Sequence, residues 1–403
     1  TIAGTVLAMA SKRGAQIQVL KGSKAVRTLP LDFAVEPYPF AGSYEMLLEE
    51  GGQPVGKLKV TVASPTPKSP TPAFTATLQR VGEPKRSAKG KFISSGSPQT
   101  VQVIFPLYQK IHPAVTFDLI LTEDSALVTA ETNPPSGTTA RGFRLAKAGL
   151  IPGGNPKLTL SLPPMVDGDR VTTPGGIGYA TGSVNSKALI PLSGLLGDAR
   201  PFTASLCLSQ TNQAVVWLTP YTDKASHLGG IIDIGDFGIP GRGAPTESAA
   251  AGLKWRVYPD PKSKAYPAGF GPLDLTANTS RWHPQTPAEA LAQSLGLDFR
   301  NVYARYLAPT GDILPSHWSL RDNFTFLPLF PADAVLFSGK AIGSKGTFTG
   351  TLKLPAPAAV SPISGVLLQD EAFGKRIGQG LIKVPITAPV KGSFQTMGIE
   401  LEN

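Results

Sequence analysis

Side chains that commonly carry chemistry are scarce in this chain of 403 residues, which has four histidines and one cysteine. None of the histidines, His112, His227, His283 and His317, has a second histidine or a carboxylate at metal-ligand spacing, so we predict no metal site. Cys207 lies at an alternating apolar position of FTASLCLS, which predicts a buried, unreactive thiol rather than a nucleophile. A single cysteine also excludes a disulfide within the chain.

Three aspartates are the candidates for carboxylate chemistry. Asp118, Asp233 and Asp236 lie on or just after predicted strands, where two of them could form a glycosidase pair. Asp233 and Asp236 could instead bind calcium, although IIDIGDFG (231–238) lacks a repeated acidic spacing. An aspartate in a turn at a strand end is the simpler interpretation. Because we also find no Gly-x-Ser-x-Gly elbow and no nucleotide-binding glycine loop, we predict a non-enzymatic protein without a cofactor.

Large aromatic residues gather in a turn-rich stretch, LKWRVYPDPKSKAYPAGFGP (253–272). An aromatic side chain removes about 150–250 Å² from water when it is buried, and the glycines around Phe270 permit positive φ. We therefore predict a packed corner that closes the open end of a β module. The predicted corner consists of Trp255, Tyr258, Tyr266, Pro267, Gly269 and Phe270.

An aromatic platform for stacking sugar rings is the rival interpretation of this region. Trp282 and His283 follow the corner closely, and Trp318 lies further along the chain. We expect Trp282 and Trp318 to be exposed, which makes them the candidate glycan contacts.

The elements that must position these residues are mainly strands. Apolar residues alternate with polar or small ones in many short segments, a period of two that indicates half-buried antiparallel strands. The clearest are 57–63, 74–81, 101–105, 115–122, 157–163, 202–209, 214–221 and 347–355. Turn residues interrupt them about every ten positions, as in sandwiches and barrels. The predicted fold class is all-β.

One short helix is predicted near 287–296, within TPAEALAQSLGLDF (286–299). Thr286 is placed as N-cap and Pro287 at the first helical position, with Glu289 completing a capping box. Gly296 is the predicted C-cap glycine.

Internal similarity divides the chain. Residues 101–121 resemble 214–234, and 56–93 resemble 177–209; residues 345–384 repeat the same meander. We expect antiparallel modules of barrel or sandwich type at 36–145 and 146–285, followed at 286–403 by the helix and a closing β half-module. Residues 1–35 are expected to be an N-terminal strand segment.

Composition and charge limit the partners. The formal net charge is +10, but lysine and arginine are scattered, and we expect the densest cluster, EPKRSAKGK (83–91), to be a solvated hairpin loop. No apolar run approaches the roughly 18 residues that span a membrane. We therefore expect no nucleic-acid partner and no membrane span.

Several segments together resemble a β-rich repeat found in large secreted or surface proteins of Verrucomicrobia and related bacteria. They are GGIGYATGSV, LSGLLGDARPFTASLCLS, VVWLTPY, LKWRVYPDPKSKAYPAGF and GTFTGTLKLP with SPISGVLLQDEAFGKRIGQGLIKV, which cover about 150–400 and, more weakly, 35–135. The family usually has Leu-Ala-Asp-Gly where this chain has LLGDARP, so Asp198 aligns but no glycine follows it. The resemblance implies an exported, non-enzymatic, all-β building block.

The function that we predict is an extracellular or cell-surface structural protein: a surface scaffold, an appendage or filament subunit, or an adhesive stalk. Its partners would be other copies of itself through β-edge contacts, or neighbouring surface-protein modules. A carbohydrate-binding module, for which the basic charge suits acidic polysaccharides, is the alternative. A polysaccharide hydrolase or lyase is a third hypothesis, which needs carboxylates or a Tyr/His/Arg cluster in one cleft.

Overall fold

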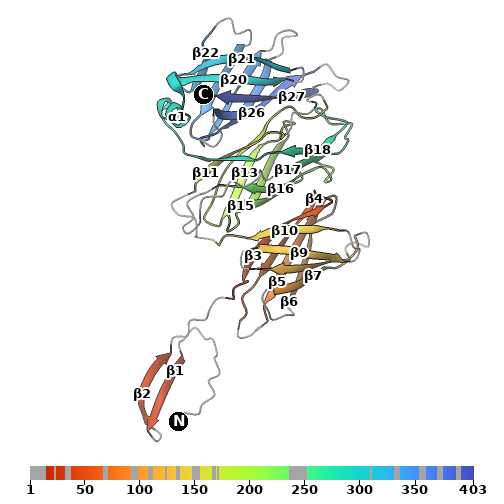
Figure 1. Ribbon diagram of the computed structural model, residues 1–403, viewed down its shortest axis with the longest axis vertical. Coiled ribbons are helices and arrows are strands. Elements are labelled where there is room, and N and C mark those ends of the chain that lie inside the picture. The colour runs from red at the N-terminus through yellow and green to blue at the C-terminus, as the bar shows by residue number, and fades with distance from the viewer. Residues whose placement is uncertain are drawn as a thin grey trace.

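The computed structural model shows an all-β protein built from antiparallel sheets (Figure 1). It describes residues 15–21, 24–31, 38–66, 71–91, 99–107, 112–122, 125–132, 137–147, 155–165, 169, 172–235, 252–308, 311–330, 336–353, 360–369, 375–386 and 392–403. The predicted fold class is confirmed. Figure 1 shows two β modules and a barrel following one another along the longest axis, with an N-terminal hairpin at the end opposite the barrel.

The N-terminal hairpin consists of β1 (Ala15–Lys21) and β2 (Lys24–Leu31), which form a two-stranded sheet of their own. An isolated two-stranded hairpin is at best marginally stable in water, so pairing with a further strand would stabilise this element.

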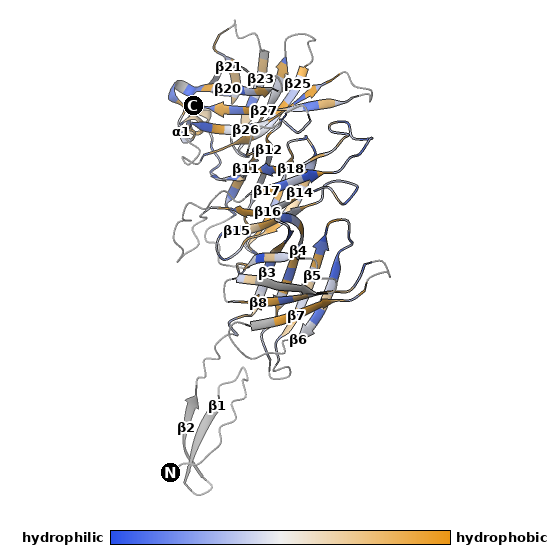
Figure 2. Cartoon of the chain, turned by 45° about the vertical axis from the view of Figure 1, so that its right-hand side comes forward, coloured by the Kyte–Doolittle hydropathy of each residue, from blue (hydrophilic) through white to orange (hydrophobic). Residues whose placement is uncertain are grey.

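The first module is an eight-stranded antiparallel sheet in the order β6-β5-β4-β3-β10-β9-β8-β7. Its strands are β3 (Gly42–Glu50), β4 (Gln53–Val62), β5 (Ala73–Arg80), β6 (Arg86–Lys91), β7 (Gln99–Phe105), β8 (Val115–Leu121), β9 (Ser125–Thr132) and β10 (Thr139–Arg144). Buried and less buried positions alternate along β4 and β8, as the period of two predicts. Figure 2 shows the corresponding alternation of apolar and polar residues along the strands.

A buried arginine bridges the two ends of this curled sheet. One terminal nitrogen of Arg86, on β6, lies 3.1, 2.6 and 2.9 Å from the carbonyl oxygens of Phe105, Pro106 and Pro113. Phe105 ends β7, and the two prolines lie between β7 and β8. The module is therefore a nearly closed barrel whose seam is joined by one side chain. The prediction of a solvated loop at 83–91 is wrong for most of its length, because residues 86–91 form β6 and Arg86 is buried.

The second module packs two sheets around one core. The five-stranded sheet, in the order β14-β13-β12-β11-β19, consists of β11 (Lys157–Leu162), β12 (Gly178–Ser183), β13 (Leu189–Leu195), β14 (Pro201–Cys207) and β19 (Asn278–Trp282). The four-stranded sheet consists of β15 (Gln213–Leu218), β16 (His227–Asp233), β17 (Leu253–Val257) and β18 (Phe270–Leu275) in chain order. Both sheets contribute to the same apolar cluster, which includes Leu160, Ile190, Val216, Leu228 and Trp255.

The last eight strands form a closed barrel. They are β20 (Asn301–Ala308), β21 (Gly311–Leu320), β22 (Thr325–Pro328), β23 (Leu336–Ile342), β24 (Thr347–Lys353), β25 (Val360–Leu367), β26 (Arg376–Pro385) and β27 (Phe394–Glu402). The prediction of a closing half-module is therefore wrong: β20 pairs with β27, and this long-range pairing completes a barrel. Each of the three similar segments does form an antiparallel meander, namely β4-β5-β6, β12-β13-β14 and β24-β25-β26.

One α-helix, α1 (Ala288–Ser294), and one short 3₁₀ helix, η1 (Asp298–Arg300), precede the barrel in the part of the chain that the structure describes. Leu291 and Ala292 of α1 belong to the barrel's apolar cluster. Gly296, at φ +63°, and Leu297 donate their N–H groups to the carbonyls of Gln293 and Ala292, a Schellman ending that agrees with the predicted C-cap glycine.

The predicted N-terminus of α1 is wrong. Pro287 is the N-cap, in an extended conformation, and no side chain caps the helix. The helix begins one residue later than expected, so Thr286 is too far back to accept the N–H bonds of a capping box. Among the described residues no helix has the length and apolar character needed to cross a membrane.

Candidate functional site

The aromatic corner is built by β17, β18 and the turn between them. The Phe270 ring meets Trp255 and Tyr266 edge to face, with centroids 4.7 and 5.6 Å away. Trp255 and Tyr266 are buried and Phe270 is half-buried. Gly269 and Gly271 have φ of +69° and +101°, and a Cβ on either would lie about 2.5 Å from a carbonyl oxygen of β17, so only glycine fits beside Phe270.

Two residues of the predicted corner lie outside its packed centre. Tyr258 is 40% exposed, with Arg256 over its ring, and Pro267 is exposed. The Pro267 carbonyl accepts the N–H of Asp260, so its contribution is to hold the turn. The apolar packing of the corner is therefore carried by Trp255, Tyr266 and Phe270.

The corner also joins the second module to the barrel. The Tyr266 hydroxyl lies 2.9 Å from the Thr396 hydroxyl on β27, and the N–H of Thr396 points to the same tyrosine oxygen. Gly176 donates its N–H to the Thr396 hydroxyl, and Phe394 donates to the carbonyl of Lys264. Burial raises the pKa of Tyr266, which keeps its hydroxyl protonated at this joint.

Further buried polar groups strengthen the junction between the second module and the barrel. Gln379 on β26 accepts hydrogen bonds from Ser161 on β11 at 2.6 Å and from Asn278 on β19 at 3.2 Å. It donates to Glu400 on β27 at 2.9 Å. The hydroxyl of Thr159 donates to the carbonyl of Leu367 at 2.8 Å. Because satisfied buried polar groups fix geometry, this junction holds the second module and the barrel in one orientation.

A buried chain of three side chains stands behind the corner. The Trp255 indole N–H donates to the Tyr221 hydroxyl at 3.1 Å, which donates in turn to the Asp198 carboxylate at 2.9 Å. Arg200 lies over the Tyr221 ring, 4.8 Å from its centroid, and its backbone N–H donates to Asp198. Burial raises the pKa of Asp198, and burial together with the aspartate raises that of Tyr221.

The turn after Asp198 places an alanine at a position where glycine would be the usual residue. Ala199 has φ of +61°, a left-handed conformation that glycine adopts without strain. The backbone geometry that glycine favours is therefore kept here by an alanine.

The predicted glycan contacts Trp282 and Trp318 are wrong, because they are only 2% and 1% exposed. The Trp282 indole donates to the carbonyl of Gly343, and the Trp318 indole donates to the hydroxyl of Ser316. Each side chain is turned inward and its polar atom is satisfied there, so neither can stack on a sugar.

The residues first considered for chemistry are dispersed. Of the histidines, His227 is buried, His283 is exposed, and His112 and His317 are half-buried. Among the described residues no three His, Cys, Asp or Glu side chains come together as a metal site. Cys207 is buried, and burial raises the pKa of its thiol.

The candidate aspartates take part in local contacts. Asp118 accepts a hydrogen bond from Gln102 on the neighbouring strand. Asp233 accepts the N–H of Gly235 at the end of β16, as a turn aspartate does. Asp236 lies outside the described residues, so the structure does not test the pair of Asp233 and Asp236.

The first and second modules meet through an apolar contact. Leu47 of β3 clusters with Val215 and Ile231, and Phe143 packs against them. Pro54 lies directly over Gly229, where a Cβ would come within 2.6 Å of the proline Cβ.

Polar contacts cross the same junction. Lys59 of β4 lies 3.5 Å from the sulfur of Cys207, and Gly82 donates its N–H to the carbonyl of Lys224. Within the first module, Lys57 of β4 forms an ion pair with buried Glu45 of β3 at 2.9 Å.

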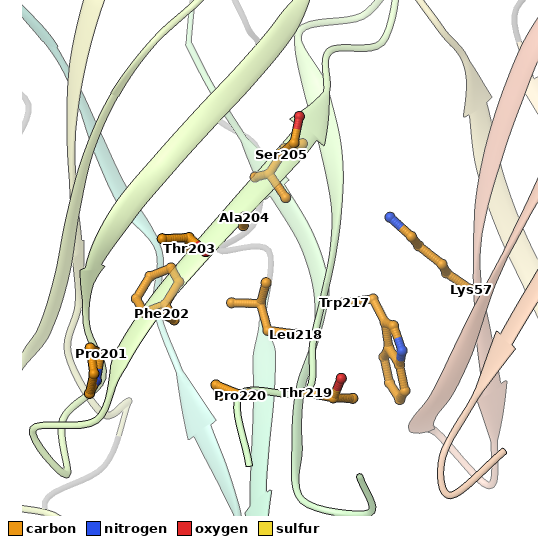
Figure 3. Close-up of a pocket in the computed structure, with 11 residues that line it drawn as sticks. Lys57, Pro201, Phe202, Thr203, Ala204, Ser205, Trp217, Leu218, Thr219 and Pro220 are labelled. Atoms are coloured by element: carbon orange, nitrogen blue, oxygen red, sulfur yellow. The ribbon is translucent and has the colours of Figure 1, made fainter. Parts of the chain in front are cut away.

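Trp217 on β15 is the residue at this junction that sequence reasoning missed. It lines two hollows, of about 380 and 360 Å³, and the residue is 8% exposed. Figure 3 shows the first hollow, with Lys57 and Trp217 opposite the β14 residues Phe202 to Ser205. The signal was the unbroken apolar run AVVWL in β15, because a strand without alternation is covered on both faces.

Comparison with known proteins adds no relative: no protein-family model matches the chain, and no curated protein or solved structure matches it. The function of the chain is therefore inferred from the geometry described above.

Proposed function

We propose that this chain is a non-enzymatic extracellular structural protein, which acts as a surface scaffold, a filament or appendage subunit, or an adhesive stalk. The observation that carries the proposal is the arrangement of two β modules and a barrel in a row, joined by side-chain contacts at both junctions (Figure 1). A row of β modules joined in this way makes the protein long and stiff, which suits a spacer or a filament subunit.

Assembly between copies is the second part of the proposal. The N-terminal hairpin has two strands only, and β14, β15 and β18 are end strands of their sheets. End strands offer unpaired backbone groups to another chain. We propose that the N-terminal segment of one copy adds to such an edge on the next.

Removal of residues 1–20 tests this assembly. The full chain is expected to form larger species with rising concentration in analytical ultracentrifugation, and the truncated chain should stay a monomer. Assemblies of equal size from the truncated chain would rule out the N-terminal segment as the donor.

A single substitution tests the backbone pairing itself. Gln18→Pro in β1 removes one N–H and should prevent assembly, whereas Gln18→Ala keeps the N–H and should assemble like the parent chain. Equal behaviour of the two variants would contradict β-edge pairing through β1.

A further inference from the structure

Two hollows flank Trp217 at the junction of the first and second modules. Their volumes are about 380 and 360 Å³, and both are lined by Trp217 and Thr219. These volumes lie in the range of small-molecule sites, which starts at about 300 Å³. Residues of both modules line each hollow, and we refer to the two hollows, which share Trp217 and Thr219, together as the cleft.

The first hollow combines an aromatic ring with hydroxyl groups and one cation. Thr203 and Ser205 are exposed on β14, and Thr219 follows β15. Lys57 reaches in from the first module, and Figure 3 shows its amine on the side of the hollow facing β14. Hydroxyls beside an indole can bond the hydroxyl groups of a sugar while the ring edge contacts its C–H groups.

The second hollow has more positive charge. Its lining includes Arg80, Lys85 and Lys224, with Glu83 as the one carboxylate. Arg80 is bonded to Glu50 at 3.1 Å, but Lys85 and Lys224 are exposed and form no ion pair among the described residues. Two cations without carboxylate partners favour an anionic ligand in this half of the cleft.

The cleft is rigid where the ligand would lie. The His227 ring packs on Trp217 with centroids 4.9 Å apart, and His227 Nδ1 lies 2.7 Å from the carbonyl of Ala225. A Cβ on Gly229 would come within 3.0 Å of the indole, so the strand backbone directly supports the ring. A fixed indole loses little entropy when a ligand binds.

We propose that this cleft binds an acidic saccharide, a sugar chain that carries carboxylate or sulfate groups. The indole and hydroxyls recognise the sugar, and Lys85 and Lys224 recognise its charge. The first hollow is lined by β14 and β15, which are also end strands of their sheets. Binding of a saccharide and assembly of copies are measured separately, so the failure of one proposal can be told from the failure of the other.

The test is a titration of the full chain with three probes: an oligogalacturonate, a sulfated chondroitin oligosaccharide and neutral maltohexaose, followed by tryptophan fluorescence and calorimetry. At least one acidic probe is expected to bind and the neutral one to bind more weakly. Lys85→Glu/Lys224→Glu should weaken acidic binding by about tenfold or more, through two lost ion pairs and new repulsion. Trp217→Phe should abolish most of the fluorescence change.

The matched control is Lys345→Glu/Lys353→Glu, which changes the net charge equally at two exposed lysines of the barrel, outside the lining of both hollows. It should bind like the parent chain. The proposal is overturned if neither acidic probe binds, if the cleft and control variants weaken binding equally, or if single-stranded DNA binds as well as the acidic sugars and competes with them.

Discussion

Replacing Tyr221 by phenylalanine removes a single oxygen from the buried chain behind the corner. The ring is kept, so its packing and the contact with Arg200 stay, and only two hydrogen bonds are lost. The Trp255 indole N–H would then be buried without a partner, which costs about 1–3 kcal/mol, and the Asp198 carboxylate would lose a bond of about 1.5–3 kcal/mol. We expect the second module to lose about 3–5 kcal/mol of its unfolding free energy.

Because the modules and the barrel can unfold separately, the measurement must resolve them. Urea titration combined with hydrogen exchange and mass spectrometry reports each module by its own peptides, and those from β15 and β17 should open at lower urea in Tyr221→Phe. Peptides from the barrel should open at a nearly unchanged concentration.

Tyr258→Phe is the control for this substitution. Tyr258 is 40% exposed, and its hydroxyl forms no hydrogen bond among the described residues, so the change should cost less than about 0.5 kcal/mol. A loss for Tyr221→Phe no larger than that of Tyr258→Phe would refute the reasoning that the buried chain of bonds stabilises the corner.

Three further predictions concern other parts of the molecule. Ala199→Gly should stabilise the second module by about 0.5–1 kcal/mol, because relief of the left-handed alanine outweighs the extra unfolded-state entropy of glycine. Ala204→Gly on β14 is the control and should destabilise the module. Thermal unfolding measures both variants, and a lower melting temperature for Ala199→Gly would contradict the idea that Ala199 is strained. Arg86→Met should destabilise the first module by about 3 kcal/mol, because the carbonyls at the seam lose their hydrogen-bond donor. Arg141→Met, at an exposed arginine of the same module, should leave the stability unchanged. Equal urea midpoints for the two variants would show that Arg86 does not join the seam. Burial holds the pKa of His227 below its ordinary value of 6.5, so as the pH falls the unfolded chain binds a proton at this histidine before the folded chain does. The unfolding free energy should therefore decrease as the pH drops through 6.5. In His227→Phe this part of the pH dependence should vanish, and an unchanged dependence of stability on pH would exclude His227 as its source.

The sequence predicts the strands well because alternation is a local property. The patterns in β4 and β8 are readable from side chains two positions apart, and Gly296 marks the end of α1 because left-handed backbone favours glycine. Closure of the barrel depends on β20 pairing with β27, which lie far apart in the chain, so no local pattern could show it.

The site was less predictable for a related reason. Trp282 and Trp318 stand among polar residues, and the sequence does not say which face of the strand meets the core; their indole N–H groups find partners inside. The cleft around Trp217 combines side chains from two modules, so its composition becomes visible only when β4 and β15 are brought together.

Negative-stain electron microscopy of the purified chain over a range of concentrations tests the central claim most directly. A structural subunit that adds its N-terminal segment to a neighbour's sheet should give filaments or regular arrays whose repeat reflects one row of modules. Isolated particles at every concentration, with no regular assembly, would contradict the proposed structural role.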